Sequence, residues 1–200
     1  NITTWHNGPN AFGCTYFQDD ISIIAGSPNN IGLRSDDHGN THQQASTIGI
    51  LANSFQASGL INTADDRDVF RITLTSSTNF RLSAIPQNVG NNNSGADMDI
   101  RVTLLNESGD TLSRYNPMDL LDAGIDTNLN SATYYLVVEG VGNANLLDYG
   151  SLGFYTLTGT LADIGVLSVN HLVLSGKNNY GNHQLQWNYQ SDEIIERIGV

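Results

Sequence analysis

The sequence predicts an all-β protein, built as an antiparallel β-sandwich or jelly roll with an irregular N-terminal segment and extra C-terminal strands. Two runs, residues 132–142 and 148–159, alternate aromatic and β-branched residues on either side of a Gly/Asn-rich loop. Charged residues make up only 14% of the 200 residues, and 20 are glycine, which favours many short strands joined by turns. A chain of this length can bury a sizeable core as one all-β domain.

The elements expected along the chain divide it into three parts, residues 1–45, 46–162 and 163–200. The first part is turn-rich and irregular, with one strand candidate at residues 21–25. The second part carries the regular alternation and predicts strands at residues 68–73, 78–84, 99–106, 124–127, 133–139 and 153–161. In the third part, residues 172–187 predict a hairpin turning at residues 178–182. Residues 193–200 begin a further element, so this part is the start of another module or a packing extension.

Charge and hydropathy exclude several classes of function. The net charge is −12 with Lys177 as the one lysine, which argues against nucleic acid and anionic membranes as partners. The sequence contains no apolar run of the length needed to insert into a bilayer. Cys14 is the single cysteine, which predicts either a buried thiol or a partner outside this sequence. The start at Asn1, without methionine or signal peptide, indicates a processed or excised part of a longer protein.

The motifs of catalysis are missing from the sequence. A zinc peptidase requires His-Glu-x-x-His, in which two histidines and a further ligand hold the metal while the glutamate activates water. His38 and His42 have the right spacing but no glutamate between them, and Gly39 and Asn40 disfavour a helix. We interpret this stretch as a linker with two solvated histidines. The Gly-Ser-Leu-Gly run at residues 150–153 lies between strands and is not a nucleophile elbow, so we expect no enzymatic activity from this chain.

A set of sequence motifs resembles a known family over residues 59–161. The motifs are Gly-Leu-Ile at 59–61, Asp-Asp-Arg-Asp-Val-Phe at 65–70, the run from Asp97 to Gly109, Asn-Pro at 116–117, Ala-Thr-Tyr-Tyr-Leu-Val-Val-Glu-Gly at 132–140 and Tyr-Gly-Ser-Leu-Gly at 149–153. In this order they resemble the bacterial pre-peptidase C-terminal domain. Residues 1–24 resemble the end of the catalytic domain in secreted reprolysin-like zinc peptidases of Bacteroidetes type, with residues 32–41 as the linker. Residues 172–200 are similar to the start of a fibronectin-like module.

This resemblance implies a non-catalytic accessory domain of a secreted metalloprotease, outside the cell or on its surface. Its partners would be the parent peptidase domain or neighbouring subunits, and it would shield, position or anchor the peptidase or hold a polymeric protein or glycan substrate. A different class remains open as an alternative. The strand-like segments at residues 20–25 and 172–187 suit a structural subunit of an extracellular filament or surface assembly, built by strand complementation between chains.

Acidic residues near the start of the first predicted core strand suggest a calcium site. Asp65, Asp66 and Asp68 cluster there, and carboxylates are the ligands that calcium prefers. In collagenase-type members of the resembled family, calcium joins an acidic linker to such a loop. The resemblance therefore implies ligands from the linker and the loop, namely Asp36, Asp37, Asn40, Asp65 and Asp68. The alternative is that these acids cap turns and solvate loops.

Four residues are candidates for glycosylation. Asn1, Asn92 and Asn106 fit the N-x-[ST] acceptor pattern, which also arises by chance in an Asn-rich chain. Thr111 lies in Asp-Thr-Leu, which resembles the O-glycosylation sequence of Bacteroidetes.

Overall fold

The structure is a computed structural model that describes residues 5–10, 13–88, 95–143, 147–164, 169–179 and 182–191. The chain forms two compact units, Asn1–Asp163 and Ile164–Val200. Two of the glycosylation candidates, Asn1 and Asn92, lie outside the described residues.

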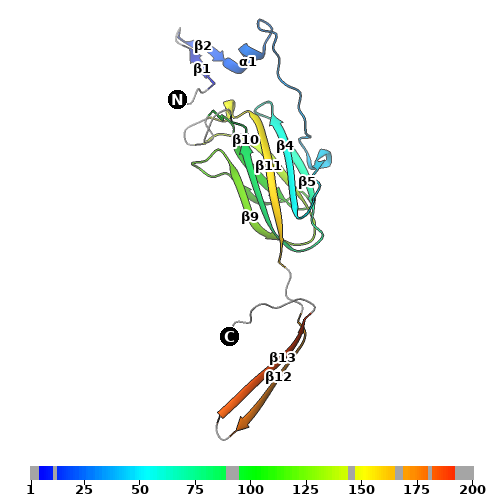
Figure 1. The fold of residues 1–200 in the computed structure, drawn as a ribbon. Helices are drawn as coiled ribbons and strands as arrows, with labels where there is room; N and C mark the ends of the chain where they lie inside the picture. The colour runs from blue at the N-terminus through cyan, green and yellow to red at the C-terminus, as the bar shows by residue number, and fades with distance from the viewer. Residues whose placement is uncertain are drawn as a thin grey trace. The chain divides into compact units, whose positions relative to one another are not determined.

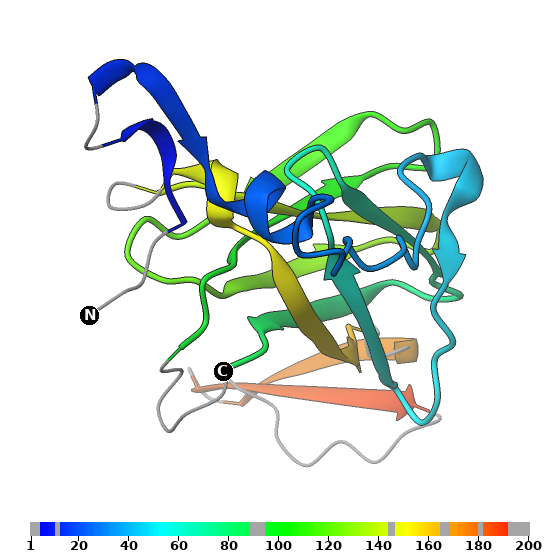
Figure 2. The same ribbon diagram turned by 90° about the horizontal axis from the view of Figure 1, so that it is seen from above.

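The first unit contains a β-sandwich of two sheets (Figures 1 and 2). The five-stranded sheet has the order β3 (Ser46–Thr47), β5 (Arg67–Thr73), β10 (Thr133–Val141), β7 (Asp99–Leu105) and β8 (Thr111–Tyr115). The four-stranded sheet has the order β4 (Ser54–Ile61), β11 (Gly153–Asp163), β6 (Thr78–Pro86) and β9 (Ala123–Leu129). Every pairing in the sandwich is antiparallel except that of β3 with β5. The predicted all-β sandwich is confirmed.

The core forms because alternate residues of each strand point between the sheets. In β6, Phe80, Leu82 and Ala84 are buried, whereas Arg81 between them is exposed. The facing sheet contributes, among others, Phe70, Ile72, Ile100, Val102, Leu104, Leu136 and Val138. Burying each such large side chain stabilises the fold by about 1.5–3 kcal/mol. The alternation of apolar and polar residues therefore determines both the strands and the face that each one buries.

All six strands predicted in the central region are present, most of them one or two residues longer than expected. Strands β3, β4 and β8 were not predicted. β4 reads Ser-Phe-Gln-Ala-Ser-Gly-Leu-Ile, whose serines and glycine are weak strand formers, and β8 lies at the edge of its sheet with mostly exposed residues. These strands depend on pairing with β11 and β7 more than on their own composition.

The N-terminal part differs from the irregular segment that the sequence predicts. β1 (Asn7–Asn10) pairs antiparallel with β2 (Gly13–Asp19), where the β-formers Thr15, Tyr16 and Phe17 supply strand propensity that β1 lacks. The strand expected at residues 21–25 is instead the helix α1 (Asp20–Ala25), because Asp19 caps it by accepting a hydrogen bond from the Ser22 amide at 2.9 Å. None of the helices in the described parts of the chain is long and apolar enough to cross a membrane.

The second unit contains one described hairpin, β12 (Val169–Asn179) paired with β13 (Asn182–Ser191). The register places Leu174 opposite Trp187 and Asn179 opposite Asn182, so the predicted hairpin is confirmed. Residues 180–181 of its predicted turn lie outside the described residues. The strand-complementation alternative requires residues 20–25 and 172–187 to be unpaired strands. Residues 20–25 instead form the helix α1, and the strands of the second segment, β12 and β13, pair with each other.

Candidate metal centre at the linker

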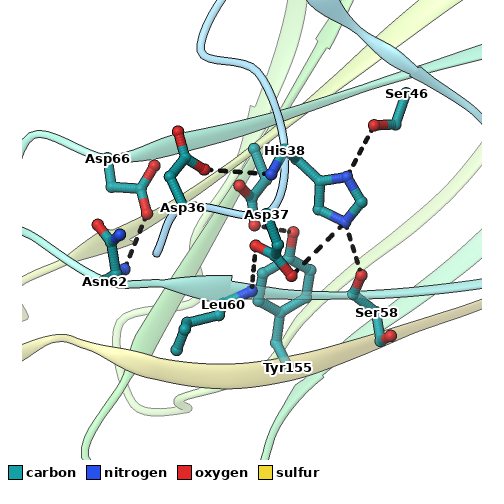
Figure 3. Close-up of polar contacts among 10 residues, drawn as sticks. Asp36, Asp37, His38, Ser46, Ser58, Leu60, Asn62, Asp66 and Tyr155 are labelled. Atoms are coloured by element: carbon teal, nitrogen blue, oxygen red, sulfur yellow. Dashed lines mark hydrogen bonds and ion pairs between the residues drawn. The ribbon is translucent and has the colours of Figure 1, made fainter. Parts of the chain in front are cut away.

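Residues 34–40 of the linker lie along the sandwich between β4 and β5 (Figure 3). The Asn62 side-chain amide donates to the Arg34 carbonyl oxygen at 2.9 Å, and the Leu60 backbone amide donates to Asp37 Oδ1 at 3.1 Å. On the other side, the Val69 amide donates to the Gly39 carbonyl oxygen at 3.1 Å. These bonds tie the linker to one strand of each sheet.

His38 fastens the middle of the linker to the sandwich. Its Nε2 lies 2.9 Å from the Ser58 carbonyl oxygen and its Nδ1 lies 2.7 Å from Ser46 Oγ. The ring also packs against Phe70 at a centroid distance of 4.6 Å, and 19% of the side chain is exposed. The interpretation of two solvated histidines was wrong for this residue, because the partners that bury it come from strands 8 and 20 residues away in sequence. His42, in the 3-10 helix η1 (His42–Gln44), is half-buried, and its ring contacts the Tyr135 ring in an edge-to-face arrangement.

Three carboxylates meet beside the linker. Asp36 is exposed, whereas Asp66 and Asp68 are buried with 5% and 0% of their surface exposed. One oxygen from each lies within 4.8 Å of the other two. Figure 3 shows Asp36 on the linker facing Asp66. We call these three residues the aspartate trio.

The hydrogen bonds of the trio leave two buried oxygens without a donor. Asp66 Oδ2 accepts a hydrogen bond from the Asn62 backbone amide at 2.8 Å, and Asp68 Oδ2 accepts one from the Tyr155 hydroxyl at 2.5 Å. The Oδ1 atoms of both residues are buried and have no hydrogen-bond partner among the described residues. A buried carboxylate oxygen without a donor is costly, and a proton, a bound water or a cation can offset that cost.

The pKa values of Asp66 and Asp68 reflect the same cost of burying a charged carboxylate. Burial raises the pKa of Asp68 from 3.8 to about 7, and the hydrogen bond from Tyr155 opposes this rise. Burial also raises the pKa of Asp66, helped by the nearby charge of Asp36. A divalent cation bound by the trio would replace these protons and favour the ionised carboxylates.

The donor set fits a hard cation. The trio supplies carboxylate oxygens alone, which are typical ligands of calcium and magnesium, and contains no histidine or cysteine. Two of its members are held in place, Asp66 by the Asn62 amide and Asp68 by Tyr155. Water or backbone carbonyls would complete the shell, because calcium takes about 6–8 oxygens.

The structure brings together two of the five ligands predicted from the sequence, Asp36 and Asp68. Asp37 instead accepts from the Leu60 amide, and Asn40 Oδ1 accepts from the Arg67 amide at 2.8 Å. Asp65 is exposed and is outside the trio. Asp66 takes its place and was not among the predicted ligands. Its spacing of two residues from Asp68 was the available signal, because alternate residues share a face.

The remaining candidates for catalysis and glycosylation lie in turns, at strand ends or in the core. Ser151 is buried, and its hydroxyl accepts from the Asp99 amide at 2.8 Å and donates to the Asp99 carbonyl oxygen at 3.1 Å. Asn106 Oδ1 accepts from the Asp110 amide at 2.8 Å, within the turn before β8. Thr111 is exposed at the first position of β8.

Comparisons with known proteins found similarity to solved structures alone. No family model and no curated protein matches the chain. Among solved structures, the chain is similar to the pre-peptidase C-terminal domain of a collagenase from Bacillus anthracis. The likeness has 18% sequence identity and a TM-score of 0.44, and it covers 61% of this chain and all of that domain.

Proposed function

We propose that this chain is a calcium-stabilised, non-catalytic β-sandwich domain that serves as an accessory part of a secreted metalloprotease. The calcium ion would bind the aspartate trio and hold the linker on the sandwich. The observation that supports the metal site is the pair of buried Oδ1 atoms of Asp66 and Asp68, which have no hydrogen-bond partner within the described parts of the chain. Both residues belong to the trio, in which one oxygen of each carboxylate lies within 4.8 Å of the others.

The proposed role follows from where the trio sits. Asp36 belongs to the linker, whereas Asp66 and Asp68 belong to the loop before β5 and to β5 itself. An ion shared by these residues would connect the segment before the sandwich to the sandwich, so that the two keep a fixed geometry. Such a joint suits a domain that positions or steadies a neighbouring peptidase. The parent protease, its secretion and its partners are proposed on the sequence motifs described above.

Calcium titration with thermal unfolding tests the metal site. The chain is first treated with a chelator, and its Tm is then measured with increasing calcium. We expect Tm to rise with calcium, because the ion binds the folded state alone. At about 100 times Kd the gain is about 2.7 kcal/mol. Magnesium at the same concentration should raise Tm less, because it requires a stricter octahedral shell.

Substitutions at adjacent acids make the test specific. Asp66→Asn removes a trio carboxylate and should abolish the calcium-dependent rise in Tm. Asp65→Asn removes the same charge one residue away, at an exposed position outside the trio, and should keep the full rise. No rise in the unsubstituted chain, or an equal loss in both variants, would refute a calcium site at the trio.

A further inference from the structure

The outer face of the five-stranded sheet collects most of the positive charge of the first unit. Residues 1–163 contain six arginines and no lysine, against 17 acidic residues. The strand alternation places four of those arginines on the outer face, because their neighbours Phe70, Ile72, Ile100 and Val102 are buried in the core. The four are Arg67, Arg71, Arg101 and Arg114, and we call this surface the arginine face.

Cross-strand register fixes the arrangement of the arginine face. Arg67 on β5 and Arg101 on β7 flank Glu139 on β10, with nitrogen-to-oxygen distances of 3.2 and 2.9 Å. Arg71 lies four residues along β5 from Arg67, about 13 Å at the usual rise of a strand. Arg114 lies opposite Thr103 on the edge strand β8.

The charge of this face is opposite to that of the molecule. Four arginines and one glutamate give it a net charge of +3, and the Glu139 side chain is only 13% exposed. Asp99 has the same phase on β7 but is 1% exposed, where Ser151 contacts it. Arg67, Arg71 and Arg114 are exposed. In a chain with a net charge of −12, such segregation marks a surface with its own partner.

Apolar and aromatic groups lie among the arginines. Leu112 is 51% exposed and lies two residues from Arg114 in β8, at the point where the register with β7 shifts. Tyr135 is half-buried, lies opposite Arg71 and makes an edge-to-face ring contact with His42 of η1. Arginine and tyrosine are enriched in protein interfaces, where a guanidinium pairs with a carboxylate through two parallel hydrogen bonds.

We propose that the arginine face docks an acidic protein surface that carries carboxylates beside apolar side chains. Charge complementarity identifies the carboxylates, and Leu112 and Tyr135 call for apolar groups next to them. A dense polyanion such as a sulfated glycan has no apolar groups to match these residues. The proposal is independent of the calcium site, because the trio is not part of this face.

Binding of two defined polymers to the full chain tests the proposal. The first probe is a random copolymer of glutamate and tyrosine, which presents carboxylates and aromatic rings. The second is dextran sulfate, which presents anionic charge alone. We expect the copolymer to bind and dextran sulfate to bind more weakly in fluorescence anisotropy at about 50 mM salt. Binding of the copolymer should weaken at about 300 mM salt, because the contacts include exposed ion pairs.

Charge-reversed variants locate the binding. Arg71→Glu and Arg114→Glu should each raise the Kd of the copolymer roughly tenfold, which corresponds to about 1.4 kcal/mol. Arg81→Glu is the matched control, because it changes the net charge equally but lies on the outer face of the other sheet, where it pairs with Asp126 at 3.1 Å. Circular dichroism confirms that each variant is folded. The proposal is overturned if the copolymer does not bind, if dextran sulfate binds as tightly, or if Arg81→Glu weakens binding equally.

Discussion

The Tyr155 hydroxyl donates a hydrogen bond of 2.5 Å to Asp68 Oδ2, and the two residues are 1% and 0% exposed. Tyr155 belongs to β11 of the four-stranded sheet, and Asp68 belongs to β5 of the five-stranded sheet. The bond therefore links the two sheets through a polar contact inside the sandwich. It also orients Asp68 within the aspartate trio.

Replacing Tyr155 by phenylalanine should destabilise the sandwich by about 1–3 kcal/mol, because it leaves a second oxygen of Asp68 buried without a donor. The loss of this bond should also raise the pKa of Asp68 further, since the bond lowers it. Urea unfolding gives the change in free energy. Tyr134→Phe is the control, because the Tyr134 hydroxyl donates to the Asn130 carbonyl oxygen, which is outside the trio. Equal and small losses in both variants would contradict a special role for Tyr155.

Gly59→Ala should be strongly destabilising. A Cβ atom at Gly59 would lie 2.3 Å from the Tyr155 hydroxyl oxygen and 2.4 Å from Asp68 Oδ2, so the added methyl group would displace the bond between the sheets. We expect a loss of about 1–3 kcal/mol or more. Gly49→Ala is the matched control, because nothing lies within 4 Å of a Cβ there. Thermal unfolding gives the Tm of both variants. Similar Tm values would contradict this expectation and would mean that the β4–β11 pair adjusts to the methyl group.

Asp68 should make the stability of the metal-free chain depend on pH. Its pKa is about 7 in the folded state and 3.8 at its ordinary value, so between these values the folded state holds a proton that the unfolded state releases. Below about pH 4 both states are protonated and this residue has no effect. As pH rises to about 7, its contribution lowers the free energy of unfolding by roughly 4 kcal/mol at most.

The Asp68→Asn variant isolates that contribution. Asparagine stays neutral, so in chelator the variant should gain stability relative to the unsubstituted chain as pH rises from about 4 to about 7. Urea unfolding of both proteins at several pH values gives the difference. A difference that does not change with pH would mean that Asp68 is already ionised in the folded state. With calcium present the ranking should reverse near neutral pH, because the variant lacks a ligand.

His38→Phe should loosen the linker while keeping a ring against Phe70. The phenyl ring cannot make the hydrogen bonds to the Ser58 carbonyl oxygen and Ser46 hydroxyl, so we expect a loss of about 1–3 kcal/mol. Amide exchange at Leu60 provides a local measurement, because this amide donates to Asp37 beside His38. Exchange at Leu60 should become faster in His38→Phe. His6→Phe, at an exposed position near the N-terminus, should leave it unchanged. Unaltered exchange in both variants would show that His38 does not hold the linker.

The sequence predicts those elements of the fold that carry their own pattern. β6 alternates Phe80, Leu82 and Ala84 with exposed positions, and such a strand is specified by its own residues. β4 and α1 are not specified by their own residues. β4 depends on its pairing with β11, and α1 depends on a cap from Asp19 that outweighs the strand preference of its isoleucines. Local patterns cannot report such contacts.

The same limit applies to the candidate site. Acidic residues at 36–37 and 65–68 indicate a cluster, and the structure brings Asp36 and Asp68 together. Which of the adjacent residues Asp65 and Asp66 points inward depends on where β5 begins, which is one residue before the strand expected from sequence. His38 looked solvated because its partners Ser46 and Ser58 are distant in sequence.

The position of the linker affects how readily another chain can pair with the edge of the sandwich. β4 is an edge strand, and an exposed edge is a template onto which another chain can add a strand. The side chains of Asp37 and His38 occupy the Leu60 amide and the Ser58 carbonyl oxygen on this edge. The linker therefore covers part of this edge and disfavours edge-to-edge pairing with another chain. We expect a shortened version that began after residue 45 to expose these groups and to self-associate more readily.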